Sequence, residues 1–132
     1  MKILFLDDDL SRRDLFSRLV NRRAHDVFIC ADAMAAMSCL QEMQPFDFVF
    51  LDHDLGGEAY VDTDHKNTGS EVARFIVKHL PKIKRIIIHS VNSPASEHMY
   101  ALLTSAGYMV EYIPWGWMKA DRIINETTIA QK

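Results

Sequence analysis

The chain lacks three features: a framework of paired cysteines, a long hydrophobic run and an excess of positive charge. Its 132 residues include two cysteines, Cys30 and Cys39, and these are not spaced as a CxxC pair. Such cysteines are typical of reduced, packed thiols. No apolar stretch approaches the ~20 residues of a membrane span, and the start, MKILFLDDDL, becomes acidic too early for a secretory signal. We therefore expect a cytoplasmic protein with no membrane partner.

The charge balance limits the partners further. The formal net charge is −3, so no overall basic field attracts duplex nucleic acid or an anionic membrane. Any phosphate ligand must be held by local groups. The length suits one domain with one core, and we see no repeats, linkers or low-complexity segments. We expect a single domain over residues 1–126 and a polar tail over 127–132.

Short hydrophobic runs alternate with segments whose apolar residues recur at helical spacing. The expected strands cover residues 2–6, 26–30, 46–51, 85–89 and 108–113. The helical segments follow residues 11, 32, 68 and 93, and a short helical candidate covers about 118–125. The expected N-caps are Asp9, Asp32, Thr68 and Ser93. This alternation predicts an α/β fold, a doubly wound parallel sheet with helices on both faces.

Polar residues gather where three of these strands end. In such a sheet, ligands bind outside the carboxyl ends of the strands. Several carboxylates meeting there repel one another unless a cation lies among them. We expect Asp8 and Asp52 to be joint ligands of a divalent metal, Mg²⁺ or Mn²⁺, helped by Asp7 or Asp54. The residues at this edge are Asp7, Asp8, Asp9, Asp52, His53, Asp54, His89, Ser90 and Asn92.

Several of these side chains allow two interpretations. His89 or His53 would carry a proton in catalysis, or else each is a satisfied histidine of the core or its rim. Thr68, Ser90 and Asn92 are candidates for orienting a phosphate.

Two further segments are also ambiguous. The long polar loop from 52 to 67 either covers the edge or is simply solvated. Trp115 and Trp117 either stack on a base or fill the core.

The order of elements, the ILFLDDD start and the aspartate after the third strand make the chain resemble a response-regulator receiver domain. The resemblance implies a flavodoxin-like three-layer sandwich with strand order 2-1-3-4-5. It implies that Asp7 and Asp8 bind Mg²⁺, that Asp52 accepts a phosphoryl group and that Ser90 supplies the hydroxyl. The chain departs from the family where the fifth strand ends, because Ile113 stands in place of the lysine before Pro114.

A more specific resemblance rests on three motifs together. LDHDLGG, TGSEVARFI and IIIHSVN, followed by M..LL..AGY, are similar to the cyclic-phosphate processing receiver domains. That similarity implies metal-dependent processing of a cyclic phosphate or cyclic nucleotide. We therefore expect a metal-dependent phosphodiesterase. The alternatives are a pseudo-receiver that binds a nucleotide or partner protein without cleaving anything, and a phosphoacceptor domain. The Met-rich and aromatic helices allow a homodimer, though core packing explains them equally well.

Overall fold

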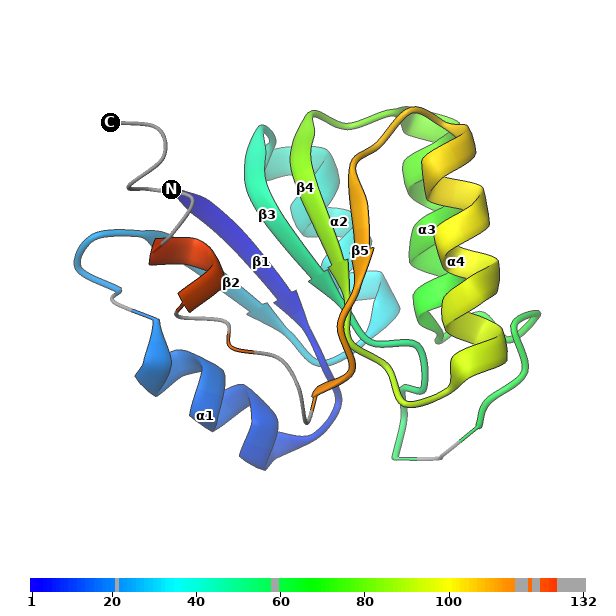
Figure 1. Cartoon of the computed structure of the whole chain (residues 1–132), viewed down its shortest axis with the longest axis horizontal. Helices are drawn as coiled ribbons and strands as arrows, with labels where there is room; N and C mark the ends of the chain where they lie inside the picture. Colours follow the sequence, from blue (N-terminus) through cyan, green and yellow to red (C-terminus); the bar gives the residue numbers. More distant parts are fainter. Residues whose placement is uncertain (21, 58–59, 116–118, 120–121, 126–132) are drawn as a thin grey trace.

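Strands and helices alternate along the chain (Figure 1). The computed structural model describes residues 1–20, 22–57, 60–115, 119 and 122–125. The strands are β1 (Lys2–Leu6), β2 (Asp26–Cys30), β3 (Phe46–Leu51), β4 (Ile83–Ile88) and β5 (Val110–Tyr112). The helices are α1 (Leu10–Leu19), α2 (Ala33–Met43), α3 (Gly69–His79) and α4 (Ser93–Ser105). No helix of the described part is long and apolar enough to cross a bilayer.

The five strands form one parallel sheet in the order β2-β1-β3-β4-β5. This is the strand order that the resemblance to receiver domains implied. The strand order reverses at β1, because the chain runs outward from β1 to β2 and then returns to the other side of β1 as β3. The carboxyl ends of β1 and β3 therefore lie side by side at the point where doubly wound sheets bind ligands.

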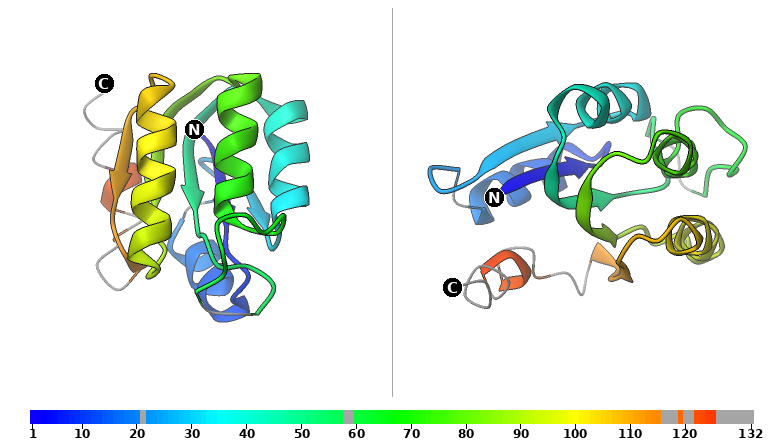
Figure 2. Two further views of the ribbon diagram at one scale, coloured as in Figure 1. Left: turned by 90° about the vertical axis from the view of Figure 1, so that its right-hand side faces the viewer. Right: turned by 90° about the horizontal axis from the view of Figure 1, so that it is seen from above.

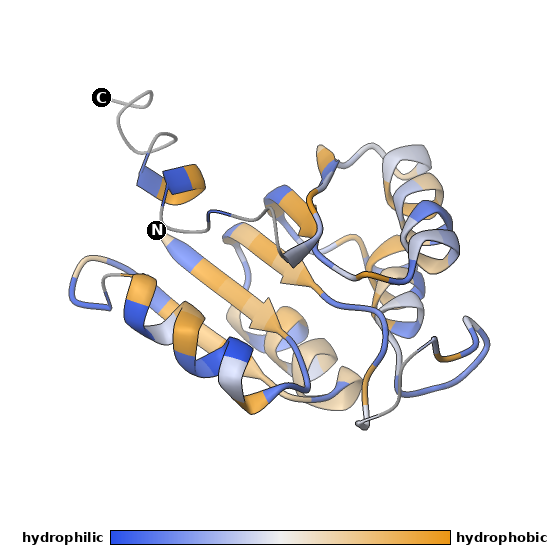
Figure 3. Ribbon diagram, turned by 60° about the horizontal axis from the view of Figure 1, so that its bottom comes forward, coloured by the Kyte–Doolittle hydropathy of each residue, from blue (hydrophilic) through white to orange (hydrophobic). Residues whose placement is uncertain are grey.

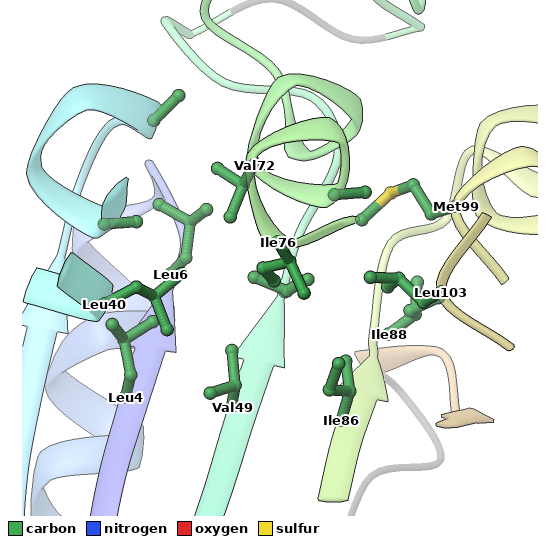
Figure 4. Packing of buried hydrophobic residues seen from close by; sticks show 14 of the residues in the cluster. Leu4, Leu6, Leu40, Val49, Val72, Ile76, Ile86, Ile88, Met99 and Leu103 are labelled. Carbon is green, nitrogen blue, oxygen red and sulfur yellow. The ribbon is translucent and has the colours of Figure 1, made fainter. Parts of the chain in front are cut away.

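Helices cover both faces of the sheet, which confirms the three-layer arrangement (Figure 2). Helices α2, α3 and α4 pack on one face, against residues such as Leu4, Leu6 and Val49 (Figure 4). On the other face, Phe5 and its neighbours pack against α1 and against Ile124 of the helical stretch at 122–125. Alternate residues of β1 thus belong to opposite layers, as expected of a strand that is buried on both faces.

The helix starts largely follow the predicted caps. The side chains of Asp9, Asp32 and Thr68 each accept a hydrogen bond from a backbone N–H in the first turn of α1, α2 and α3. The prediction that Ser93 caps α4 is wrong, because Asn92 caps this helix by accepting from the backbone N–H of Ala95. Asn92 keeps an extended backbone conformation, as an N-cap requires.

The remaining expectations concern the thiols and the end of the chain. Cys30 and Cys39 are both free; Cys30 is buried in the core, and Cys39 of α2 packs against it. Trp115 packs against the layer that contains Phe5, so the core interpretation holds for this tryptophan. Within the expected short helix, residues 122–125 are helical. Trp117 and the tail at 127–132 lie outside the described residues.

Candidate functional site

The register of the sheet brings Asp7, Asp52 and His89 into one row. Leu6 of β1 pairs with Leu51 of β3, and Leu51 pairs with Ile88 of β4. Each of the three polar residues directly follows one of these paired positions. Backbone hydrogen bonds continue the row beyond the strands, since Asp52 N donates to Leu6 O and His89 N donates to Leu51 O. The backbone pairing of the strands therefore sets the spacing of these three residues, independently of their side-chain contacts.

The side chains of Asp7, Asp8 and Asp52 form a cluster that we call the carboxylate triad. One carboxylate oxygen from each residue lies within 4.8 Å of the others. Asp7 is fully buried and Asp52 is 5% exposed, whereas Asp8 is half-buried at the rim. The loop that leaves β1 and the loop between β3 and α3 are hydrophilic, while the strands are apolar (Figure 3). The triad thus lies where the core meets solvent.

Arg12, in the first turn of α1, partly neutralises the triad. Its Nε donates to Asp7 Oδ2 at 2.7 Å and its Nη2 to Asp7 Oδ1 at 3.0 Å. The same Nη2 lies 3.7 Å from Asp52 Oδ2 and 4.0 Å from Asp8 Oδ1. Arg12 therefore makes a bidentate ion pair with Asp7, the most buried carboxylate, and faces the other two. Arg12 was not among the site residues predicted from the sequence.

Each triad residue also accepts a hydrogen bond from a backbone N–H group. Asp7 Oδ1 accepts from Asp9 N at 2.9 Å, and Asp52 Oδ1 accepts from His53 N at 2.9 Å. Asp8 Oδ2 accepts from Gly57 N at 2.6 Å, which ties the loop after β3 to the triad. Gly57 has a φ of +82°, a conformation that L side chains rarely adopt. The loop reaches Asp8 because a glycine stands at this position.

The buried carboxylates shift the pKa of their neighbours. Burial raises the pKa of Asp52 to about 8, and the negative charge of Asp7 adds to this effect. The positive charge of Arg12 lowers it only in part. The hydrogen bond to Asp7 raises the pKa of Arg12 above its ordinary value. Without a further cation, the site thus favours a protonated Asp52 near neutral pH.

His89 lies beneath the triad and is inaccessible from outside. Its ring is 1% exposed and stacks on Phe5 with the ring centroids 5.0 Å apart. Nε2 lies 3.2 Å from the carbonyl oxygen of Leu6, and Nδ1 lies 3.7 Å from Asp7 Oδ2 without a hydrogen-bond partner among the described residues. Burial lowers the pKa of His89 to about 4, so the ring is neutral at pH 7 and its Nε2–H donates to Leu6.

Asp54 belongs to a second cluster, which we call the Asp54 network. Its Oδ1 lies 2.8 Å from His53 Nδ1, 3.0 Å from Asn92 Nδ2 and 2.9 Å from Val61 N, and its Oδ2 accepts from Tyr60 N at 2.6 Å. Burial raises the pKa of Asp54, but the hydrogen bonds from Asn92 and His53 outweigh this effect and the pKa is lowered. Asp54 therefore anchors the loop and α4 rather than joining the triad.

The remaining predicted site residues also make structural contacts. Thr68 Oγ1 donates to His65 O and accepts from Glu71 N, so its hydroxyl is used by the start of α3. Ser90 Oγ accepts from Asn92 N at 3.1 Å, and both residues are buried. His53 is fully buried with its Nε2 unpartnered among the described residues. The structure thus brings Asp7, Asp8 and Asp52 together, with His89 beneath them, and places the others elsewhere.

Helix α3 begins unusually close to the end of β3. Gly69 N donates to His53 O at 2.9 Å. A Cβ atom on Gly69 would lie 2.1 Å from the carbonyl oxygen of Asp52 and 2.9 Å from the Cα of His53. The close approach therefore requires glycine at this position, and it holds the backbone of Asp52 in place.

The triad fits a small divalent cation. All its donors are oxygens, which Mg²⁺ and Ca²⁺ prefer, and the cluster contains no imidazole nitrogen that would favour Mn²⁺. Oxygens on opposite sides of Mg²⁺ lie about 4.2 Å apart, since each bond is about 2.1 Å. The 4.8 Å spread of the triad is slightly wider. The three carboxylates would therefore have to move slightly closer together to hold one ion.

Several solved structures that match this fold are receiver domains. The signal receiver domain of a putative Luxo repressor protein from Vibrio parahaemolyticus is 17% identical, with a TM-score of 0.66 over 97% of this chain and 87% of that one. A CheY-like receiver domain protein from Methanospirillum hungatei is 18% identical, with a TM-score of 0.63 over 98% and 91%. The response regulator TrrA from Thermotoga maritima, solved in complex with Mg²⁺-BeF, is 21% identical, with a TM-score of 0.63 over 98% and 96%.

Sequence comparison gives a more specific result. No curated protein matches the chain. The family model described as the cyclic-phosphate processing Receiver domain matches residues 2–105, which include every strand except β5 and the whole carboxylate triad. The chain therefore belongs to the cyclic-phosphate processing Receiver domain family.

Proposed function

We propose that the domain binds one divalent cation at the carboxylate triad and hydrolyses a P–O bond of a small cyclic phosphate or cyclic nucleotide. The observation that carries the proposal is the meeting of Asp7, Asp8 and Asp52 within 4.8 Å at the carboxyl edge of the sheet. The description of the family supports the choice of a cyclic phosphate as substrate.

Mg²⁺ suits this all-oxygen set, and Asp7, Asp8 and Asp52 would hold it. A bound divalent cation neutralises charge on phosphoryl oxygens and lowers the pKa of a nearby water molecule. Hydrolysis of a phosphate ester depends mainly on such charge neutralisation and on positioning, and little on covalent chemistry by the protein. The carboxylates and Arg12 are groups of the kind that this task needs.

The protein's own residues position the reacting groups. The buried Asp7 holds Arg12 through two hydrogen bonds, and the rim residue Asp8 holds the loop after β3 through Gly57 N. The Leu6 carbonyl fixes the His89 ring through Nε2, which places Nδ1 3.7 Å from Asp7 Oδ2. Because His53 and His89 are buried, we assign them positioning roles rather than direct proton transfer to a substrate.

A phosphoacceptor role is the second candidate, favoured by the place of Asp52 at the end of β3 in a receiver fold. One observation weighs against it. The position that carries a lysine in such receivers holds Ile113, which packs against the apolar layer of Phe5 and cannot neutralise an acyl phosphate. Hydrolysis of a bound substrate does not require a cation at this position.

The decisive experiment incubates purified protein with 2′,3′-cyclic phosphates, cyclic mononucleotides and cyclic dinucleotides, with Mg²⁺ or with chelator. Asp52→Asn removes a triad ligand, and Asp14→Asn, on the exposed face of α1, is the matched control. We expect a linear phosphate product that needs Mg²⁺, disappears in Asp52→Asn and persists in Asp14→Asn.

Two other outcomes contradict the proposal. Nucleotide that binds but is recovered intact after long incubation identifies a binding module. Stoichiometric labelling by a small phosphodonor such as acetyl phosphate, lost in Asp52→Asn and without turnover of any cyclic phosphate, identifies a phosphoacceptor.

A further inference from the structure

Arg12 is the cation that contacts all three triad carboxylates in the part of the chain that the structure describes. When a divalent cation binds and all three carboxylates are ionised, their charge of −3 and the +1 of the guanidinium leave −2, which the divalent cation balances. With that cation bound, the site is neutral and no longer repels an anion. The neighbouring Arg13 does not take part in this balance, because its Nη1 donates to the backbone carbonyl of Asp7.

The guanidinium keeps donors available. Arginine has five N–H donors, and hydrogen bonds to Asp7 use one at Nε and one at Nη2. The side chain is 34% exposed, whereas Asp7 is fully buried. The pair therefore holds the guanidinium rigidly on its inner edge while the outer edge faces solvent at the rim of the triad. A planar fork fixed in this way is well suited to the oxygens of a phosphate.

We propose that Arg12 binds the phosphoryl group of the substrate beside the divalent cation, a role that rests on the function proposed above. It would supply at the start of α1 the positive charge that Ile113 cannot supply at the end of β5. Asp7 acts as the positioning residue that aims Arg12, and Asp9 fixes the first turn of the helix by capping it through Arg12 N at 2.9 Å.

The alternative is a simpler role for Arg12, in which its side chain neutralises the metal-free triad and moves away when the metal binds. The two roles predict opposite behaviour. A cation that only fills the triad competes with Mg²⁺ and has no effect on anion binding. A phosphate-binding arginine contributes to anion affinity after Mg²⁺ has bound.

The test compares wild type, Arg12→Gln, Arg12→Lys and the control Arg18→Gln. Arg18 lies on the same helix, is 79% exposed and pairs with Asp14 away from the triad. Mg²⁺ affinity is measured by calorimetric titration of chelator-treated protein. Affinity for inorganic phosphate is then measured at saturating Mg²⁺ by calorimetry or ³¹P NMR, and thermal unfolding shows that each variant is folded.

We expect Arg12→Gln to bind Mg²⁺ at least as tightly as wild type, because a neighbouring positive charge has been removed. Its phosphate affinity should fall by about tenfold to a hundredfold, as for the loss of a charge-assisted hydrogen bond. Arg12→Lys, which keeps the charge but not the fork, should lie between the two. Arg18→Gln should match wild type in both measurements.

Equal phosphate affinity in Arg12→Gln and Arg18→Gln would overturn the inference while leaving the proposed function intact. A parallel loss of Mg²⁺ and phosphate affinity in Arg12→Gln would also overturn it, since Arg12 would then only hold the triad together. Wild type that binds Mg²⁺ but no phosphate would overturn the inference too, whereas the absence of Mg²⁺-dependent turnover of every cyclic phosphate would contradict the proposed function.

Discussion

Replacing Asp52 by asparagine should stabilise the metal-free protein. The carboxylate is 5% exposed and lies beside the buried charge of Asp7, and a single guanidinium serves both. Asparagine has nearly the same shape, and its Oδ1 can still accept the hydrogen bond that His53 N donates to Asp52. The substitution therefore removes a poorly solvated charge with little change in packing.

The shifted pKa sets the size of this effect. Burial raises the pKa of Asp52 from an ordinary value of 3.8 to about 8. One pKa unit corresponds to about 1.4 kcal/mol, so the cost of ionising Asp52 has a ceiling of about 6 kcal/mol. Relaxation and water entry reduce such costs, and we expect a gain of roughly 2–4 kcal/mol in Asp52→Asn above pH 8.

The dependence on pH has a definite sign. A carboxyl group whose pKa is raised by folding stabilises the protein at low pH, and this contribution is lost as the pH rises through the folded-state value. The contribution of Asp52 to the free energy of unfolding, which is the difference between wild type and Asp52→Asn, should therefore fall between about pH 4 and about pH 8, the two pKa values of Asp52. Urea denaturation of both proteins in the presence of chelator measures this difference.

Saturating Mg²⁺ should narrow this difference in stability. A ligand at a hundred times its dissociation constant stabilises the folded state by about 2.7 kcal/mol, and only the wild type retains the full triad. The reasoning is refuted if Asp52→Asn is no more stable than wild type at pH 8 to 9 in chelator. Asp14→Asn, which alters an exposed carboxylate, should leave the pH profile unchanged.

Three further predictions concern the surroundings of the triad. The wild type should lose stability as the pH falls from 6.5 to about 4, because His89 is neutral when buried but becomes protonated on unfolding, and His89→Gln should reduce this loss. An equal loss in the free energy of unfolding of both proteins over this pH range, measured by urea denaturation, would contradict the prediction. Asp54→Ala should lower the free energy of unfolding by roughly 3 kcal/mol or more and make the loop after β3 sensitive to protease. Asp62→Ala is the control, and equal digestion of the two variants would contradict the prediction. Gly69→Ala should destabilise the protein by more than about 3 kcal/mol in thermal or urea unfolding, because its Cβ would overlap the Asp52 carbonyl, and wild-type stability would show that α3 can shift.

The position of the triad could be predicted from the sequence because it depends on the strands. Asp7 and Asp52 each follow a continuous apolar run, and adjacent parallel strands in register must bring their ends together. Asp8, one residue further, reaches the same point from the rim. These predictions needed only the strand order and the register of neighbouring strands.

The roles of the other polar residues could not be predicted in the same way. Alternation of side chains would turn Asp54 toward Asp52, but β3 ends at Leu51 and the chain then curves so that Asp54 contacts His53 and Asn92. Asn92 and Thr68 are used as helix caps, a local role that competes with ligand binding.

Arg12 was missed because its contact depends on how α1 lies on the sheet. The sequence contains one signal: an arginine in the first turn of the helix, five residues after a buried aspartate and three after the N-cap Asp9. At this spacing the side chain can reach back to the carboxyl end of β1. The same sequence pattern is compatible with an exposed arginine, so only the packing of α1 distinguishes the two.

The central claim is that Asp7, Asp8 and Asp52 together hold one divalent cation. Calorimetric titration of chelator-treated protein with MgCl₂ tests it most directly, in wild type, Asp8→Asn, Asp52→Asn and Asp14→Asn. We predict one Mg²⁺ per chain, an affinity at least about tenfold weaker in either triad variant, and no change in Asp14→Asn. Absence of Mg²⁺ binding in the wild type, or equal affinity in all four proteins, would contradict the account.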